Sequence, residues 1–232
     1  MLDDKTFLDI TRGVRNPGRE LPPQLAQHAT DTADMRQNLP ILYGIVAGLG
    51  AQSVLEIGTS DGTSTLAFLK AVSETGGHVT SIDIADVPVA KVLIEQYGLT
   101  SHWTFLQGRS HDVLARLVQE NRVYDAIFVD GDHTRLGATR DFAEASKMLR
   151  KGGVILTHDN WMAACDHDFS KPFGQRGIEG CAFLGHELLT GSDWVGVVFP
   201  FNCNLGIFRR RSECVGEIAA SIEESRKVGL VP

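Results

Sequence analysis

Short apolar segments alternate with amphipathic segments from residue 53 onward. The apolar segments predict strands, and the segments between them carry apolar residues at helical spacing. We expect strands at Ser53–Ile57, His78–Ile84, Trp103–Leu106, Tyr124–Val129 and Val154–Thr157, and helices at Thr63–Glu74, Pro88–Tyr97, Ser110–Gln119 and Arg135–Leu149. Strands that alternate with helices form a parallel sheet covered on both faces, so the pattern predicts a doubly wound α/β domain.

The two ends of the chain follow other patterns. Residues 1–37 are polar and rich in turn residues, and we interpret them as an N-terminal arm before a helix that Asn38 caps. After the fifth strand we expect a polar loop over 161–177, a helix at Ile178–Leu189 and a terminal β-hairpin of Trp194–Phe199 and Leu205–Arg209. The domain then spans 38–210, with 161–193 on its substrate side. We expect residues 211–232 to form a last helix and tail, whose apolar face favours a homo-oligomer contact but could equally pack back on the sheet of its own chain.

Composition narrows the class of protein. Among 232 residues, 22 Lys and Arg stand against 29 Asp and Glu, a formal charge of −7 that argues against nucleic-acid or anionic-membrane partners. The acidic start Met1-Leu-Asp-Asp-Lys is unlike a signal peptide, and the longest apolar run is too short to span a bilayer. The 4 cysteines show no CxxC spacing. We therefore expect a cytoplasmic protein with reduced thiols.

The first strand leads into a loop with two glycines. The loop runs from Glu56 through Gly58 and Gly62 to Ser64, and its glycines let the backbone pass close to a ligand. It lacks both the GxGxxG fingerprint and the Lys-Ser/Thr ending of a P-loop. Asp83 ends the second strand, where a carboxylate can accept the hydroxyls of a ribose.

Acidic residues also follow strands four and five. Strand four runs into Asp130-Gly131-Asp132-His133, and strand five into His158-Asp159-Asn160. Adjacent parallel strands would bring Asp130 together with Asp159 and Asn160. Two carboxylates and an amide oxygen are hard ligands that suit Mg²⁺, Ca²⁺ or Mn²⁺. The sequence thus predicts a divalent-metal site at this edge of the sheet.

The loop, the acid and their order resemble the class I S-adenosylmethionine-dependent methyltransferases, whose fold is a seven-stranded, mostly parallel, Rossmann-like sheet. The resemblance implies that the first loop holds the methionine part of the cofactor, Asp83 the ribose, and the segment after strand three the adenine. The cofactor residues that it implies are Glu56, Gly58, Thr59, Ser60, Gly62, Ser64, Asp83, Ser110, His111 and Asp130.

Residues 38–161 further resemble the cation-dependent O-methyltransferases of the catechol and caffeoyl-CoA type. Those enzymes have an Asp after strand four and an Asp-Asn pair after strand five, which implies that Asp130, Asp159 and Asn160 bind the cation. They also carry a Lys three positions after the first Asp, where this chain has His133. An Asp-x-x-His is similar to sugar O-methyltransferases that modify macrolides, with the His as base.

The resemblance implies metal-dependent methyl transfer to a hydroxyl of a small molecule, with Asp130 and His133 as catalytic residues. A sugar is favoured over a catechol, and a polyketide or phenol stays open. Two alternatives remain: a methyltransferase without metal, in which the acids are structural caps, and a non-catalytic module that binds S-adenosylmethionine. Structural interpretations are favoured at three further places: a turn acid for Asp132, a structural residue for His158 and a solvated lid for the cluster Asp166-His167-Asp168.

Overall fold

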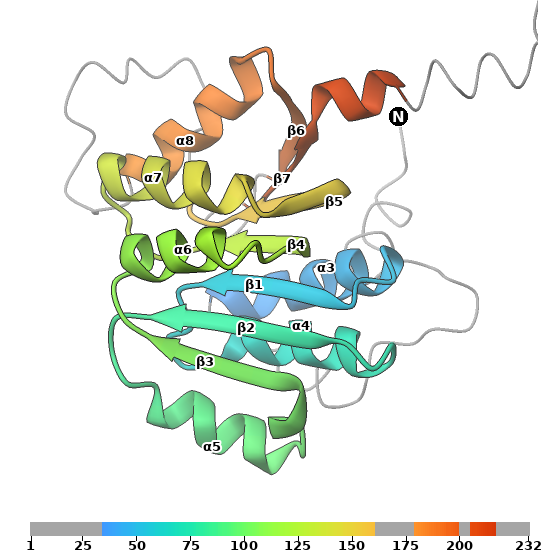
Figure 1. Cartoon of the computed structure of the whole chain (residues 1–232), viewed down its shortest axis with the longest axis vertical. Helices are drawn as coiled ribbons and strands as arrows, with labels where there is room; N and C mark the ends of the chain where they lie inside the picture. The colour runs from blue at the N-terminus through green and yellow to red at the C-terminus, as the bar shows by residue number, and fades with distance from the viewer. Residues whose placement is uncertain (1–33, 161–178, 200–204, 217–232) are drawn as a thin grey trace, which may run out of the picture.

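The computed structural model describes residues 34–160, 179–199 and 205–216 (Figure 1). A sheet of seven strands runs through the centre in the order β3-β2-β1-β4-β5-β7-β6. The first five are parallel, whereas β7 is antiparallel to both β5 and β6. The strands are β1 (Ser53–Ile57), β2 (His78–Asp83), β3 (Trp103–Gln107), β4 (Tyr124–Val129), β5 (Leu149–Thr157), β6 (Trp194–Phe199) and β7 (Leu205–Arg210). The prediction of a doubly wound, seven-stranded sheet with a terminal hairpin is confirmed.

Helices cover both faces of this sheet and bury one apolar cluster on each. One cluster holds residues of α3 (Asp34–Gly48), α4 (Thr63–Ser73) and α5 (Pro88–Gln96). The other holds residues of α6 (Ser110–Gln119), α7 (Arg135–Ser146) and α8 (Glu179–Thr190). The Thr100–His102 turn is a 3₁₀ helix that leads into β3. Since both faces are covered, the central strands are apolar on both sides, as β4 with its sequence YDAIFV shows.

The helix before β1 begins earlier than the sequence predicted. α3 starts at Asp34, so Asn38 lies inside the helix, and the prediction that Asn38 caps it was wrong. Asn38 is fully buried, and its amide nitrogen lies 3.3 Å from Nε2 of His158. The partner of this side chain is therefore a residue 120 positions away, and capping rules that consider only neighbouring residues could not identify it.

The fifth strand also begins earlier than expected. Lys151-Gly152-Gly153 was predicted as a turn before the strand, but Leu149 already pairs with Tyr124. The next pair joins Ala126 to Val154, so residues 150–153 bulge opposite a single residue of β4.

Several predicted segments lie outside the described residues. These are most of the N-terminal arm, the 161–177 loop with Asp166, His167 and Asp168, and the helix beyond residue 216. Residues 211–216, at the start of that last helix, are helical. Among the helices that the structure describes, none has the length and apolar character needed to cross a membrane.

Candidate functional site

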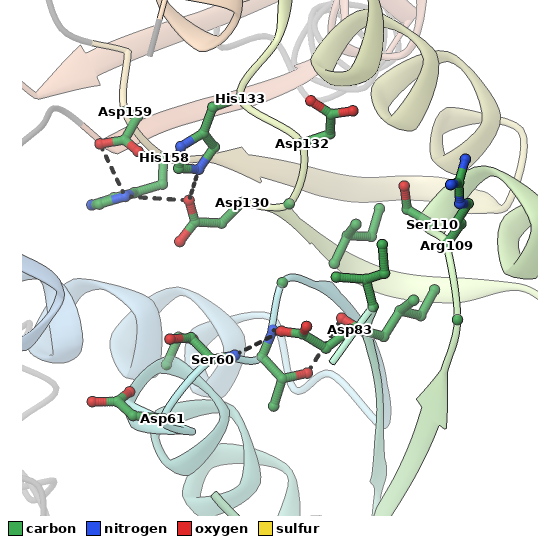
Figure 2. Close-up of a pocket in the computed structure, with 18 of the residues that line it drawn as sticks. Ser60, Asp61, Asp83, Arg109, Ser110, Asp130, Asp132, His133, His158 and Asp159 are labelled. Atoms are coloured by element: carbon green, nitrogen blue, oxygen red, sulfur yellow. Dashed lines mark hydrogen bonds and ion pairs between the residues drawn. The ribbon is translucent and has the colours of Figure 1, made fainter. Parts of the chain in front are cut away.

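A cavity of about 820 Å³ opens at the carboxyl ends of the five parallel strands. This is where open α/β sheets bind ligands, and its size falls in the range of small-molecule sites. Each of the segments that follow β1, β2, β3, β4 and β5 contributes to its lining, and Met35 of α3 adds to one wall. Figure 2 shows the labelled side chains around this space. Of the predicted site residues, the cavity is lined by Gly58, Thr59, Ser60, Ser64, Asp83, Ser110, His111, Asp130, His133 and Asp159.

Gly58 brings the first loop against the end of β4. Its φ is +93°, and a Cβ at this position would lie 2.0 Å from the carbonyl oxygen of Asp130. The Asp130 amide donates to the carbonyl of Ile57 at 2.8 Å, and the Gly58 amide donates to Ile82 at 2.9 Å. No residue with a side chain fits here without moving the backbone of Asp130.

Asp83 ties the first loop to the end of β2. Its Oδ2 accepts hydrogen bonds from the backbone amides of Thr59 at 3.0 Å and Ser60 at 2.9 Å, and its Oδ1 accepts one from Ala85 at 2.9 Å. A carboxylate has about four acceptor positions, and three are used here. The Asp83 side chain therefore orders the loop. Its predicted contact with a ribose would be a second role.

Glu56 lies beneath the loop and does not line the cavity. Its fully buried carboxyl group accepts hydrogen bonds from the hydroxyls of Ser64, Thr65 and Ser81, each at 2.6 Å. Burial raises its pKa from 4.5 to about 7, although the three hydroxyl donors act in the opposite direction. In this structure Glu56 joins the start of α4 to β2, which differs from the direct cofactor contact that the resemblance implied.

Gly62, the second glycine of the loop, also lies outside the cavity lining. Its φ is +83°, and a Cβ there would lie 2.6 Å from Cβ of Ala90 on α5. Gly62 therefore lets α4 begin close to α5, whereas Ser64, two residues later, reaches the cavity.

The opposite end of the cavity is formed after β3 by Gly108, Arg109, Ser110 and His111. Buried Asp141 of α7 lies behind this end, near the Ser110 side chain and the Asp132 backbone, both of which lower its pKa. Burial outweighs these two effects and raises the pKa of Asp141. Asp141 thus lies between the Ser110 end of the cavity and the loop that carries His133. Nothing in the sequence pattern distinguished Asp141 from other acids on exposed helix faces.

Asp130, His133 and Asp159 form a compact cluster whose possible ligand atoms all lie within 4.8 Å of one another. Nε2 of His133 lies 3.4 Å from Oδ1 of Asp130 and 3.4 Å from Oδ2 of Asp159. The hydrogen bond to Asp130 raises the pKa of His133 against the effect of burial. Burial alone would raise the pKa of Asp130, but the hydrogen bonds from His133 and His158 outweigh it and lower that pKa.

The backbone at the end of β5 directs Asp159 toward Asp130. Asp159 has a φ of +56°, a left-handed conformation that Asp tolerates better than most residues. His158, just before it, is buried, and its Nδ1 lies 3.5 Å from Oδ1 of Asp130 and 3.6 Å from Oδ1 of Asp159. The two carboxylates thus lie between two imidazoles, one from each strand end (Figure 2).

Two neighbouring polar residues, Asn160 and Asp132, lie outside the Asp130–His133–Asp159 cluster. Asn160 is fully buried and absent from the cavity lining, and its amide nitrogen donates to both the carbonyl and the hydroxyl of Thr157 at 2.8 Å. Asp132 lines the cavity, but its Oδ1 accepts from the Thr134 amide at 2.8 Å, the turn arrangement that the sequence left open. Thr134 then caps α7 by accepting from Gly137.

The central part of the chain is similar to known proteins. Residues 55–160 match the family described as "Methyltransferase domain". The "Probable O-methyltransferase Rv1220c" of Mycobacterium tuberculosis H37Rv is 33% identical over 112 residues, which cover 47% of this chain and 48% of that protein. The match thus spans about half the length of the curated relative.

Solved structures share the fold over a longer stretch. The O-methyltransferase TomG of Streptomyces achromogenes, solved in complex with SAM, has a TM-score of 0.63 at 19% identity and covers 82% of this chain and 91% of its own. An O-methyltransferase of Bacillus cereus, solved with SAH, has a TM-score of 0.60 at 20% identity, with 88% of both chains covered. The resemblance of residues 55–160 to a methyltransferase domain, which the loop and the strand ends suggested, is confirmed.

Proposed function

We propose that the protein is an S-adenosylmethionine-dependent O-methyltransferase that uses a divalent cation and acts on a hydroxyl of a small molecule. One observation carries this proposal: the glycine loop after β1 and the Asp130–His133–Asp159 cluster line the same cavity. A donor held by the loop would therefore lie beside groups that can activate an acceptor hydroxyl. A module that only binds the donor would have no need of a base and a carboxylate pair at this position.

The cofactor residues follow from the lining of the cavity. Gly58, Thr59, Ser60 and Ser64 would surround the methionine part, and Asp83 lies where a ribose would follow. Ser110 and His111 would face the adenine. In this proposal Glu56 and Gly62 act on the cofactor only through the shape of the loop.

The donor set of the cluster fits a divalent cation. Asp130 and Asp159 offer two carboxylates within reach of one ion, and oxygen ligands are those that Mg²⁺ prefers. A cation held by the two carboxylates would bind the acceptor oxygen and lower its pKa. Two like charges this close also favour binding of a cation between them.

His133 is the proposed general base. Its Nε2 faces the cavity between the two carboxylates, and its side chain is 37% exposed, so an acceptor can reach it. Nε2 faces two carboxylates and therefore carries a hydrogen when no cation is bound; a cation held by the pair would replace that hydrogen and leave Nε2 bare. As the acceptor oxygen forms its bond to the methyl carbon, the bond from that carbon to sulfur breaks and the hydroxyl proton would pass to Nε2. The products are a methyl ether and S-adenosylhomocysteine. A base with a pKa near neutrality typically contributes about 10²–10⁴-fold to such a step.

The acceptor class is tested by direct methyl transfer. Purified protein is incubated with S-adenosylmethionine labelled in its methyl group and with three acceptors in parallel: a simple sugar, a glycosylated macrolactone and catechol. We expect label on a sugar hydroxyl, loss of transfer after chelation of divalent cations and recovery when Mg²⁺ is restored. Transfer to catechol alone would contradict the sugar preference.

The same assay separates the competing functions. Transfer that survives chelation would overturn the role of the cation and leave His133 as the base of a metal-free enzyme. Donor binding with no transfer to any acceptor would favour the binding module. Asp132→Asn is the matched control for Asp159→Asn: Asp132 also lines the cavity but lies outside the cluster, so only the change at Asp159 should abolish the response to Mg²⁺.

A further inference from the structure

α3 reaches the functional site although it lies outside the residues that match the methyltransferase family. Met35 lines the cavity, and Asn38, one turn later on the same face of the helix, is fully buried. A buried amide side chain needs polar partners, because an unsatisfied polar group costs about 1–3 kcal/mol. Nδ2 of Asn38 lies 3.3 Å from Nε2 of His158, which provides such a partner.

His158 lies between this amide and the carboxylate pair. The side chain is 6% exposed, and its ring centroid is 6.4 Å from that of Phe128. Nδ1, on the opposite side of the ring from the amide, lies 3.5 Å and 3.6 Å from Oδ1 of Asp130 and of Asp159. One imidazole thus links an asparagine of α3 to both acids of the cluster.

The chemistry of the three partners determines where the ring carries hydrogen. An ionised carboxylate only accepts hydrogen bonds, so Nδ1 must bear a hydrogen to face two of them favourably. An amide can either donate its N–H to a bare Nε2 or accept from a protonated Nε2. In both cases the amide holds Nε2, and the other nitrogen, with its hydrogen, is directed at Asp130 and Asp159.

We propose that Asn38 is a positioning residue that orients His158 so that the Nδ1–H holds the two carboxylates together. The carboxylates repel each other, and an N–H directed at Oδ1 of both acids, with Nδ1 at 3.5 Å and 3.6 Å, offsets part of that repulsion. His133 approaches Asp159 from its other oxygen, Oδ2, so the two rings fix different sides of the pair. The role of the pair as cation ligands rests on the proposed function, whereas the orientation of the imidazole does not.

The first test reads the hydrogen positions on His158 and needs no catalysis. Long-range ¹H–¹⁵N correlation spectra of the ¹⁵N-histidine-labelled full chain distinguish a ring nitrogen that carries hydrogen from one that does not. The chain has 8 histidines, and the signals that disappear in His158→Gln identify this one. We expect a hydrogen on Nδ1 in the wild type. A bare Nδ1 would overturn the proposal even if no Asn38 variant could be purified.

Variants of Asn38 then test whether the amide is the cause. Asn38→Leu has a similarly branched but larger side chain and no hydrogen bond, and we expect the His158 signals to change to those of a mixture of tautomers. Asn38→Asp keeps an acceptor at the same place, so Nδ1 should retain its hydrogen, with a second one on Nε2. Unchanged His158 signals in Asn38→Leu would overturn the proposal. The matched control is Leu39→Val, the next buried residue of α3, which should weaken packing by about 1 kcal/mol without altering those signals.

A second readout measures cation binding in the absence of any substrate. Residues that orient metal ligands typically contribute about 10–100-fold to affinity. We therefore expect Mn²⁺ titration to show about a 10–100-fold weaker dissociation constant in Asn38→Leu than in Leu39→Val. Equal affinity in the two variants would contradict the positioning role. Failure of the wild type to bind Mn²⁺ would instead contradict the proposed function, while the spectra would still decide the orientation of His158.

Discussion

The two halves of the cavity are built in different ways. The loop after β1 is shaped by backbone: Gly58 needs a positive φ and lies against the carbonyl of Asp130, and Asp83 holds two loop amides. The ends of β4 and β5 present side chains instead, two carboxylates between two imidazoles. Substitutions in the first half should therefore damage shape and donor binding, whereas substitutions in the second should damage chemistry and leave the fold intact.

The sharpest test of this contrast is His133→Gln. Removal of the base should lower kcat by about 10²–10⁴-fold, while the dissociation constant of S-adenosylmethionine changes little. Single-turnover methyl transfer and calorimetric titration of the donor measure the two quantities separately. A kcat within a few-fold of wild type would show that His133 is not the base.

Gly58→Ala should produce the opposite result. The new Cβ would meet the Asp130 carbonyl oxygen at 2.0 Å, and a positive φ adds strain, so we expect a loss of about 2–5 kcal/mol in the free energy of unfolding together with weak donor binding. Gly76→Ala is the matched control. Its φ is +72°, but among the described residues no atom beyond its chain neighbours lies within 4 Å of the added Cβ, so this variant should lose only about 1–2 kcal/mol in the free energy of unfolding and keep its donor affinity. Equal losses of unfolding free energy in the two variants would show that the backbone of Asp130 does not restrict the residue at position 58.

Glu56→Gln tests the buried carboxyl beneath the loop through the pH dependence of stability. The pKa of Glu56 is raised in the folded state to about 7, from 4.5, so its contribution is fully present below pH 4.5 and is lost as the pH rises toward 7. Each pKa unit corresponds to about 1.4 kcal/mol. Between pH 4.5 and 7, the free energy of unfolding of the wild type should therefore fall by about 3 kcal/mol relative to that of the glutamine variant. Denaturant unfolding of both proteins at several pH values measures the difference, which should stay constant if Glu56 titrates normally.

The smallest expected effect is at the cap of α7. Thr134→Ala removes the side-chain acceptor for Gly137 and should lower the free energy of unfolding by about 1 kcal/mol. Thr134→Ser keeps the hydroxyl and should retain most of the free energy of unfolding that Thr134→Ala loses. The affinity for S-adenosylmethionine should be the same in both variants. A loss of affinity larger than the loss of stability would show that this cap contributes to the half of the cavity at the ends of β4 and β5.

Much of this architecture is predictable because it is local in the sequence. Apolar segments such as Tyr124–Val129 predict strands wherever they occur, and the topology then brings the ends of β1, β4 and β5 to one edge. The prediction that Asp130 and Asp159 come together needed only that topology, and the structure places them in one cluster. Their roles with cofactor and cation remain predictions.

The features that sequence reasoning missed all depend on distant packing. Asn38 looks like a helix cap, and only its contact with His158 reveals another role. Glu56 looks like a ligand-facing acid, but its neighbours turn it toward three hydroxyls. The early start of β5 depends on a bulge opposite β4 that Gly152 and Gly153 accommodate rather than ending the strand. No pattern along the chain encodes these three arrangements.

The central claim is that donor and cation share one cavity, and titration calorimetry tests it most directly. S-adenosylmethionine, S-adenosylhomocysteine and Mg²⁺ are titrated into the wild type and into Asp159→Ala. We predict that both proteins bind the donor, and that the Mg²⁺ signal is lost only in the variant. Donor binding without any Mg²⁺ signal in either protein would contradict the cation site, and absence of donor binding would contradict the methyltransferase function itself.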